Sequence, residues 1–343
     1  MREVAKVFLR LGLIGFGGPV AHLALMEEEL CERRKWLTRE HFLDLVGLTN
    51  LIPGPNSTEM AIHLGYLRAG WKGLLVAGAC FLLPAVVLTT AVAWLYRRYG
   101  TLAPAQAAFK GIAPVVIAVI AAAAWRLGRT AVRNVPHALL CAACVAAVLL
   151  GLDPVLVLFA GIVVGIPVTR RALSAPPLPL FLVFLKVGAV LYGSGYVLVA
   201  FLEDELVGRG WITEQQLLDA VAVGQVTPGP VLSTATFLGY GLGGVPGALV
   251  ATVGIFLPSF VFVAMLGPLA ARLRGAAWTG PFLASVRVVS FALLVAVLAQ
   301  FCVRLDGKGG ALAVVALAAS VRFKVAAHWL ILAGALVGSL YGA

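Results

Sequence analysis

Two Pro-Gly-Pro tripeptides, each followed by hydroxyl-bearing residues, are the segments of this chain best suited to chemistry. The first occupies residues 53–55 and precedes Ser57 and Thr58; the second occupies residues 228–230 and precedes Ser233 and Thr234. Proline ends a helix, and a helix that restarts after such a break has unpaired N–H groups in its first turn. These groups, with hydroxyls beside them, bind anions through hydrogen bonds and the helix macrodipole. The chemistry indicated is binding of an oxyanion, with no metal or cofactor.

A simpler interpretation is that these side chains only cap the helices they start. Two copies in corresponding positions favour a substrate site built from both breaks. Asn50 and Gln225 add side-chain amides three residues before each tripeptide, and Lys186 can either supply a positive charge or extend to the membrane interface. The candidate substrate-binding residues are Gly17, Gly18, Asn50, Pro53, Gly54, Pro55, Asn56, Ser57, Thr58, Lys186, Gly193, Gly195, Gln225, Thr227, Pro228, Gly229, Pro230, Ser233 and Thr234.

Three ionisable residues near the breaks are candidates for proton coupling: Glu59, His63 and His22. Glu59 and His63 lie one helical turn apart on one face, a spacing that can relay or sense a proton. Ionisable groups are costly in lipid and are functional candidates by default. The alternative is that this helix lines a hydrated vestibule in which both are simply solvated. Glu59 has no carboxylate counterpart in the second half, so a proton role would be asymmetric.

The breaks belong to an internal repeat that covers both halves of the chain. The matched pairs include Phe8 and Phe184, Gly12 and Gly188, Trp36 and Trp211, Asp44 and Asp219, Gly65 and Gly239, and Pro84 and Pro258. So many matches in one register predict a duplication. We expect an N-terminal repeat at 1–170, a C-terminal repeat at 180–343 and an exposed, proline-rich linker at 171–179.

Composition identifies the environment of these elements. Hydrophobic residues make up 61% of the 343 residues, charged residues make up 12%, and the mean hydropathy is +1.00. A soluble domain of this size cannot bury so many apolar side chains. We therefore expect an all-α integral membrane protein of about 10–12 membrane segments, with broken or re-entrant helices at the Pro-Gly-Pro and glycine-rich motifs. The apolar segments are residues 74–95, 112–125, 137–150, 155–168, 245–266 and 282–303.

Positive charges favour inverted repeats. If each repeat has five full spans and the linker is cytoplasmic, most basic loop residues also face the cytoplasm. Those residues are Arg68, Lys72, Arg126, Arg129, Arg133, Arg272, Arg274, Arg322 and Lys324. Six spans per repeat would make the repeats parallel and place the last four outside. The inverted arrangement has its own cost, because it places the basic segment 33–35 on the outer surface.

The formal net charge of +11 does not indicate nucleic-acid binding, because the basic residues lie in short connections where topology explains them. Cys141 and Cys144 lie in an apolar run without a nearby His or carboxylate, so packing explains them better than metal or redox chemistry. Residues 8–13 lead into a glycine-rich break instead of a small-residue cleavage site, so no cleavable signal peptide is expected.

With these residues in view, the chain resembles the chromate ion transporter family over both halves. The motifs of the first half are Phe16-Gly17-Gly18-Pro19, Arg33-Arg34-Lys35-Trp36, Ile52-Pro53-Gly54-Pro55 and Phe81-Leu82-Leu83-Pro84. Those of the second half are Gly193-Ser194-Gly195-Tyr196, Gly210-Trp211-Ile212-Thr213, Gln225-Val226-Thr227-Pro228-Gly229-Pro230 and Phe256-Leu257-Pro258-Ser259-Phe260. Two departures stand out: Glu59 takes the place of a Gln found in many members, and Ser194 interrupts the second glycine triplet.

The resemblance implies a secondary transporter that exports chromate across the inner (plasma) membrane of a bacterium or archaeon as a multi-pass protein. It implies coupling to the proton gradient, with sulfate as a competing or exchanged substrate. The expected partners are therefore a chromate- or sulfate-like oxyanion, protons and the lipid bilayer, with no nucleic acid. The oligomeric state stays open, a homodimer included.

Other functions compete with this one. A carrier for sulfate or another oxyanion would use the same motifs, and the direction of transport follows from coupling and gradients. An intramembrane enzyme using Glu59 and His63 is the alternative from another class, but no nucleophile, base and metal-ligand pattern accompanies them. A channel would not need two matched broken helices. We therefore expect a transporter and not an enzyme.

Overall fold

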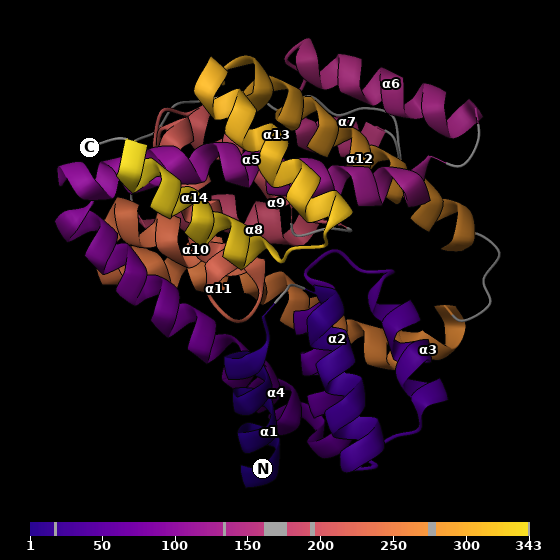
Figure 1. The fold of residues 1–343 in the computed structure, drawn as a ribbon. Helices are drawn as coiled ribbons and strands as arrows, with labels where there is room; N and C mark the ends of the chain where they lie inside the picture. Colours follow the sequence, from indigo (N-terminus) through magenta and orange to yellow (C-terminus); the bar gives the residue numbers. More distant parts are fainter. Residues whose placement is uncertain (17–18, 133–134, 161–176, 193–195, 274–278, 342–343) are drawn as a thin grey trace. The chain divides into compact units, whose positions relative to one another are not determined.

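The computed structural model describes residues 1–343 except 17–18, 133–134, 161–176, 193–195, 274–278 and 342–343. The described residues form helices and turns, with no strand among them, which confirms the all-α fold class (Figure 1). Two compact units are present, and each takes segments from both halves of the sequence. Unit 1 comprises Met1–Val92, Pro177–Gly195 and Thr227–Leu283, and unit 2 comprises Ala93–Pro176, Tyr196–Val226 and Ala284–Ala343.

The helices of unit 1 are α1 (Arg2–Ile14), α2 (Pro19–Glu27), η1 (Glu28–Arg33), α3 (Arg39–Thr49), α4 (Asn56–Tyr99) as far as Val92, α8 (Pro177–Val190), η3 (Val231–Ser233), α11 (Thr234–Leu273) and the start of α12 (Thr279–Val303). Those of unit 2 are the end of α4, α5 (Ala103–Ala131), α6 (Val135–Leu149), α7 (Pro154–Ala160), α9 (Leu198–Leu202), η2 (Glu203–Val207), α10 (Glu214–Val226), the rest of α12, α13 (Gly307–Arg322) and α14 (Ala327–Tyr341). The predicted repeat boundaries stay a prediction, and linker residues 171–176 lie outside the described residues.

Helices α4 and α11 are each a hairpin of two legs. In a straight helix, residues eight positions apart are separated by about 12 Å. A Cβ added to Gly65 would nevertheless overlap the carbonyl of Gly73, and a Cβ added to Gly239 would overlap that of Gly247. The chain must therefore reverse between them. We call the residues before each reversal the short leg (56–68 in α4, 234–242 in α11) and those after it the long leg (71–99 and 245–273).

The two reversals have nearly the same backbone conformation. Ala69 has φ −150° and ψ 26°, and Gly70 has φ 61° and ψ −150°. Gly243 has φ −146° and ψ 19°, and Gly244 has φ 61° and ψ −148°. Matching angles at matching sequence positions show that the duplication seen in the sequence is also a duplication of structure.

Leg length limits what each leg can do in a bilayer. At 1.5 Å per residue the short leg of α4 is about 20 Å long and its long leg about 43 Å, against a hydrocarbon core of about 30 Å.

Glycines bring each long leg against the first helix of its own repeat: Gly12 of α1 meets the backbone of Phe81, and Gly188 of α8 meets that of Ile255. A side chain at either glycine would separate the two backbones.

The long leg of α11 carries apolar side chains on its outer face. Val245, Leu249, Val253, Leu257, Val261 and Met265 recur every fourth residue, and all six are exposed. Residues at this spacing form one continuous stripe on a helix. A stripe of this kind is unfavourable in water but suits contact with lipid tails.

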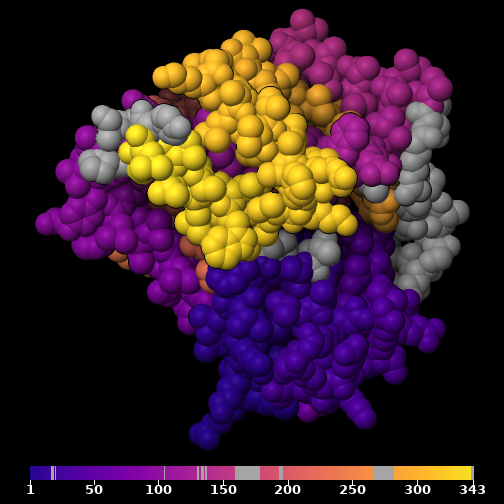
Figure 2. All heavy atoms as spheres, in the orientation of Figure 1, coloured from indigo at the N-terminus to yellow at the C-terminus, as the bar shows by residue number. Residues whose placement is uncertain are grey.

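Unit 2 is built around α5, which packs against α13 and α14 (Figure 1). Gly334 and Gly338 of α14 lie against Gly111 of α5, so the two backbones approach closely, as small residues allow in membrane helices. Figure 2 shows α13 and α14 as one closely packed surface. The large apolar side chains Trp329, Leu332, Leu336 and Leu340 are exposed on α14.

Four helices of the described chain are long and apolar enough to cross a membrane: Asn56–Tyr99, Ala105–Arg129, Val231–Met265 and Phe282–Val303. They contain four of the six predicted apolar segments. Residues 137–150 correspond to the shorter α6, and residues 155–168 run beyond α7 into a stretch outside the described residues. The sequence does not predict α14 as a membrane segment, although Ala327–Leu340 is a short apolar helix. The number of membrane segments and the inverted orientation stay predictions.

The hairpin of α11 can be tested with two glycines of the same short leg. We expect Gly239→Ala to lower the melting temperature of the detergent-solubilised protein, because the methyl group would meet the Gly247 carbonyl and Ala251 at a cost of about 1–3 kcal/mol. Gly241→Ala is the control, since a Cβ there meets nothing within 4 Å. It should be neutral or stabilise the helix by up to about 1 kcal/mol. Equal melting temperatures for the two variants would contradict the hairpin.

Candidate substrate site

The two Pro-Gly-Pro segments, which we call the first break (residues 53–55) and the second break (residues 228–230), are held by reciprocal hydrogen bonds. The N–H of Gly54 donates to the carbonyl of Leu191, just after the end of α8, at 2.6 Å. The N–H of Gly229 donates to the carbonyl of Gly15, just after the end of α1, at 2.8 Å. Each break is therefore tied to the end of the first helix of the other repeat, within unit 1.

Both central glycines have a backbone conformation that favours glycine. Gly54 has φ 140° and Gly229 has φ 100°. A Cβ added to Gly54 would overlap the Glu59 carboxyl group and lie 2.7 Å from Ser259 Oγ. A Cβ added to Gly229 would lie 2.7 Å from the Ala85 side chain. Conformation and space thus both require glycine at the two positions.

A helix restarts after each break, as the sequence predicts, and this helix is the short leg. In α4 the N–H groups of Thr58 and Glu59 donate to the carbonyl of Pro55, at 2.8 and 3.2 Å. In the second repeat the 3₁₀ turn η3 comes first, and the N–H of Ser233 donates to the carbonyl of Pro230 at 2.9 Å. Two helix N-termini with their positive dipole ends thus lie at the breaks.

Several polar side chains at the breaks are buried without a hydrogen-bond partner among the described residues. They are the hydroxyls of Ser57, Thr58, Ser233 and Ser259 and both carboxyl oxygens of Glu59. Each of these residues is at most 1% exposed. Buried polar groups in proteins nearly always have a partner, so a group without one calls for an explanation. A ligand rich in hydrogen-bonding oxygens is such an explanation.

Two residues near the first break were not predicted as site residues. Ser259, on the long leg of α11, lies against Gly54. The hydroxyl of Tyr192 donates to the carbonyl of Leu51 at 3.4 Å. Burial and the nearby Glu59 carboxylate raise the pKa of Tyr192 to about 12. The repeat offered a signal for both, because Ser259 corresponds to Ala85 and Tyr192 to Phe16, two places where only the second repeat is polar.

His22 supports the backbone at the glycine-rich segment. Its Nε2 lies 2.9 Å from the carbonyl of Gly15, the same oxygen that accepts from Gly229, and its ring contacts Phe81 edge-on. Burial lowers the pKa of His22 below its ordinary value of 6.5. A neutral ring that donates through Nε2 fits this position. His63 is buried on the short leg of α4, as is Glu59.

Three side chains expected to bind substrate form hydrogen bonds within the protein. Asn50 donates to the carbonyl of Val46 at 2.8 Å and accepts from the side chain of Asn56. Thr234 donates to the carbonyl of Val231 at 2.7 Å. Gln225 belongs to unit 2, where its Oε1 accepts from the Tyr196 hydroxyl at 3.3 Å. These side chains therefore have structural contacts that the sequence could not show, although the Nε2 of Gln225 is buried without a hydrogen-bond partner among the described residues.

The remaining candidates divide between described and undescribed parts of the chain. Lys186 is half-buried on α8, and Thr227 is half-buried before the second break. The prolines flanking the two central glycines, Pro53, Pro55, Pro228 and Pro230, lie in the breaks themselves. Gly17, Gly18, Gly193 and Gly195 lie outside the described residues.

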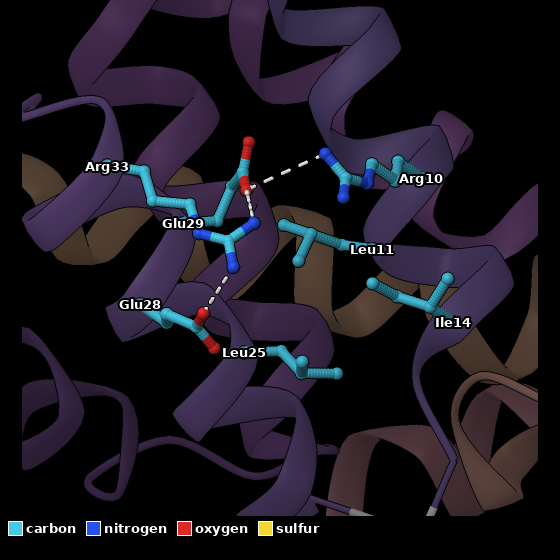
Figure 3. Close-up of a pocket in the computed structure, with 7 residues that line it drawn as sticks. All are labelled: Arg10, Leu11, Ile14, Leu25, Glu28, Glu29 and Arg33. Carbon is cyan, nitrogen blue, oxygen red and sulfur yellow. Dashed lines mark hydrogen bonds and ion pairs between the residues drawn. The ribbon is translucent and has the colours of Figure 1, made fainter.

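A charged pocket elsewhere in unit 1 is a poorer anion site (Figure 3). Arg33 pairs with Glu28 at 2.6 Å and with Glu29 at 3.7 Å, and Arg10 lies 3.9 Å from Glu29. Arg34 also pairs with Glu29, at 2.7 Å. Glu29, which these arginines share, is buried. The arginines of this pocket are already paired with carboxylates.

Asp219 in unit 2 is a further buried carboxyl group. It is 1% exposed and accepts hydrogen bonds from the Tyr96 hydroxyl at 2.7 Å and the Gln215 amide at 2.8 Å. Burial raises the pKa of Asp219 from 3.8 to about 6. The sequence matches Asp219 to Asp44, but it does not show that Asp219 is buried.

Asp219 should make stability depend on pH. Since its pKa is higher in the folded state, the folded protein holds this proton over a pH range in which the unfolded chain has lost it, and stability falls as the pH rises through about 6. The loss is roughly 3 kcal/mol for a shift of this size. We expect the melting temperature to drop between about pH 4 and about pH 6, the range between the two pKa values, and to drop less in Asp219→Asn. The same drop in both proteins would rule out this role.

Comparison with known proteins agrees with the motifs and the repeat. The family model described as chromate transporter matches the chain twice, over residues 2–166 and 178–339. The chromate transport protein of Cupriavidus metallidurans is 35% identical over 297 residues, which cover 78% of this chain and 74% of that protein.

Two further relatives have similar coverage. The probable chromate transport protein of Synechococcus elongatus is 33% identical over 78% of this chain and 76% of its own length. The chromate transport protein of Pseudomonas aeruginosa is 32% identical over 74% and 70%. No solved structure matches the chain. Because the family model covers nearly all of both halves, the chain belongs to the chromate transporter family.

Proposed function

We propose that this protein exports chromate across the plasma membrane in exchange for protons, with the oxyanion bound at the first and second breaks. The observation that carries the proposal is that the hydroxyls of Ser57, Thr58 and Ser233, just after the two breaks, are buried without a hydrogen-bond partner among the described residues. Each break is tied to the other repeat by a backbone hydrogen bond. Hydroxyls and helix N-termini suit a tetrahedral dianion, because each of its oxygens accepts hydrogen bonds. Relatives named chromate transport proteins support chromate as the substrate.

The pairing of the breaks suits alternating access. Each break is anchored on the other repeat by one backbone hydrogen bond, so a movement of one repeat against the other would displace both breaks together. The matched hairpins of α4 and α11 provide two equivalent elements for such a movement. In this proposal the repeats are inverted, and the short legs enter the membrane without crossing it.

Glu59 is the proposed proton-coupling residue. Its carboxyl group is 0% exposed, lies against Gly54 and has no hydrogen-bond partner among the described residues. An ionised carboxylate is costly in such surroundings and would repel a dianion next to it, so the buried Glu59 holds a proton and competes with the oxyanion for the space beside Gly54. Oxyanion binding from the cytoplasmic side would displace the carboxyl group into water, where it loses its proton. After the oxyanion leaves on the outer side, a proton taken up there would return the carboxyl group to its buried position. Chromate movement would thereby be linked to proton movement.

Flux in everted membrane vesicles, whose outer face is the cytoplasmic face, tests the function. We expect saturable chromate accumulation that increases when the lumen is made acidic, because protons then leave as chromate enters. In Glu59→Gln the flux should continue without responding to the pH gradient. Glu40→Gln, a change at an exposed carboxylate of α3, should behave like the wild type.

The outcomes separate the parts of the proposal. Vesicles without the protein give the background. Robust sulfate flux with no chromate flux would overturn the substrate, although sulfate competing with chromate would be expected of a site of this kind. A gradient response that persists in Glu59→Gln would overturn the role of Glu59.

A further inference from the structure

The pseudo-symmetry of unit 1 places chemically different residues at equivalent positions beside the two breaks. The repeat aligns Leu83-Pro84-Ala85 with Leu257-Pro258-Ser259. Gly54 of the first break lies against Ser259, and Gly229 of the second break lies against Ala85. Each break thus meets the residue after the long-leg proline of the other repeat, but only the first break meets a hydroxyl.

The Ser259 hydroxyl has no structural task among the described residues. It is 0% exposed and has no hydrogen-bond partner there. Buried Ser and Thr in helices usually donate to the carbonyl four residues earlier. Thr89 donates in this way to Ala85 at 2.6 Å, and Thr252 to Ala248 at 2.7 Å. Ser259 lies two turns after Thr252 on the same long leg and does not, so its donor stays free.

The surroundings of Ser259 fit an oxyanion. Its hydroxyl and the Glu59 carboxyl group both lie beside Gly54, where the chain enters the short leg of α4. The first turn of that leg adds the buried hydroxyls of Ser57 and Thr58 and the positive end of the helix dipole. These groups come from both repeats and supply donors, which a dianion requires.

We propose that Ser259 is a substrate-binding residue, which donates a hydrogen bond to the oxyanion at the first break, and that its counterpart Ala85 has no such role. The proposal rests on the proposed function and adds a ligand from the second repeat. It makes the two breaks unequal: the first binds substrate with groups from both repeats, whereas the residue that faces the second break from the other repeat is apolar.

Removal of the hydroxyl distinguishes binding from folding. In proteoliposomes, Ser259→Ala should raise the KM for chromate about tenfold or more, since a hydrogen bond to a charged ligand is lost, with a smaller effect on kcat. The same variant should melt at an equal or higher temperature, because the unpartnered hydroxyl contributes nothing to the fold. A purely structural serine would give the reverse: lower stability with an unchanged KM.

Two further variants complete the test. Ala85→Ser adds a hydroxyl at the equivalent position and should leave the KM unchanged. Ser259→Cys has the same shape, slightly larger, but only a weak S–H donor, so its KM should also rise. This variant decides the matter if Ser259→Ala does not accumulate in the membrane. A wild-type KM in Ser259→Ala or Ser259→Cys would overturn the proposal. Absence of chromate transport by the wild type would instead contradict the proposed function.

Discussion

Backbone hydrogen bonding is the constraint on which this structure depends. In a bilayer an unpaired N–H group costs several kcal/mol, so a chain that interrupts a helix there must find another acceptor. At the two Pro-Gly-Pro breaks that acceptor is the carbonyl at the end of the first helix of the other repeat, Leu191 for Gly54 and Gly15 for Gly229. The breaks are therefore possible because the repeats occur together. The same pair of bonds holds both half-helices where their N-termini can face a substrate.

Duplication explains the symmetry of this arrangement. Small differences between the copies place polar side chains in only one of two equivalent positions. The hairpin turns of α4 and α11 are nearly identical in backbone angles, and their glycine contacts correspond. Side chains at corresponding positions differ, however. Glu59 has no acidic counterpart, Tyr192 replaces Phe16, and Ser259 replaces Ala85. The polar member of each of these pairs lies near the first break, so a symmetric scaffold carries an asymmetric set of groups.

Local patterns made much of this predictable from sequence. The repeat and the helix breaks follow from short motifs and apolar runs, and the structure has them where the sequence indicates. The sequence left open whether Glu59 and His63 are buried or solvated, and the structure buries both. Contacts between distant segments could not be predicted. Nothing in the neighbourhood of Ser259 indicates that it lies against Gly54, and the bond between the side chains of Asn50 and Asn56 depends on how the chain turns between them. The sequence places Arg68 and Lys72 in a loop and starts the predicted spans after both reversals, but it does not show that each short leg packs back against its long leg, as the contact of Gly65 with Gly73 does.

The most direct test of the account is the position of the bound oxyanion. Chromium scatters X-rays anomalously, so a crystal of the protein soaked with chromate would show the ion without ambiguity. We predict a chromium peak beside Gly54, placed so that the oxygens of the oxyanion accept hydrogen bonds from the first turn of α4 and from Ser259. A peak in the pocket of Arg10 and Arg33, with none at the breaks, would contradict it.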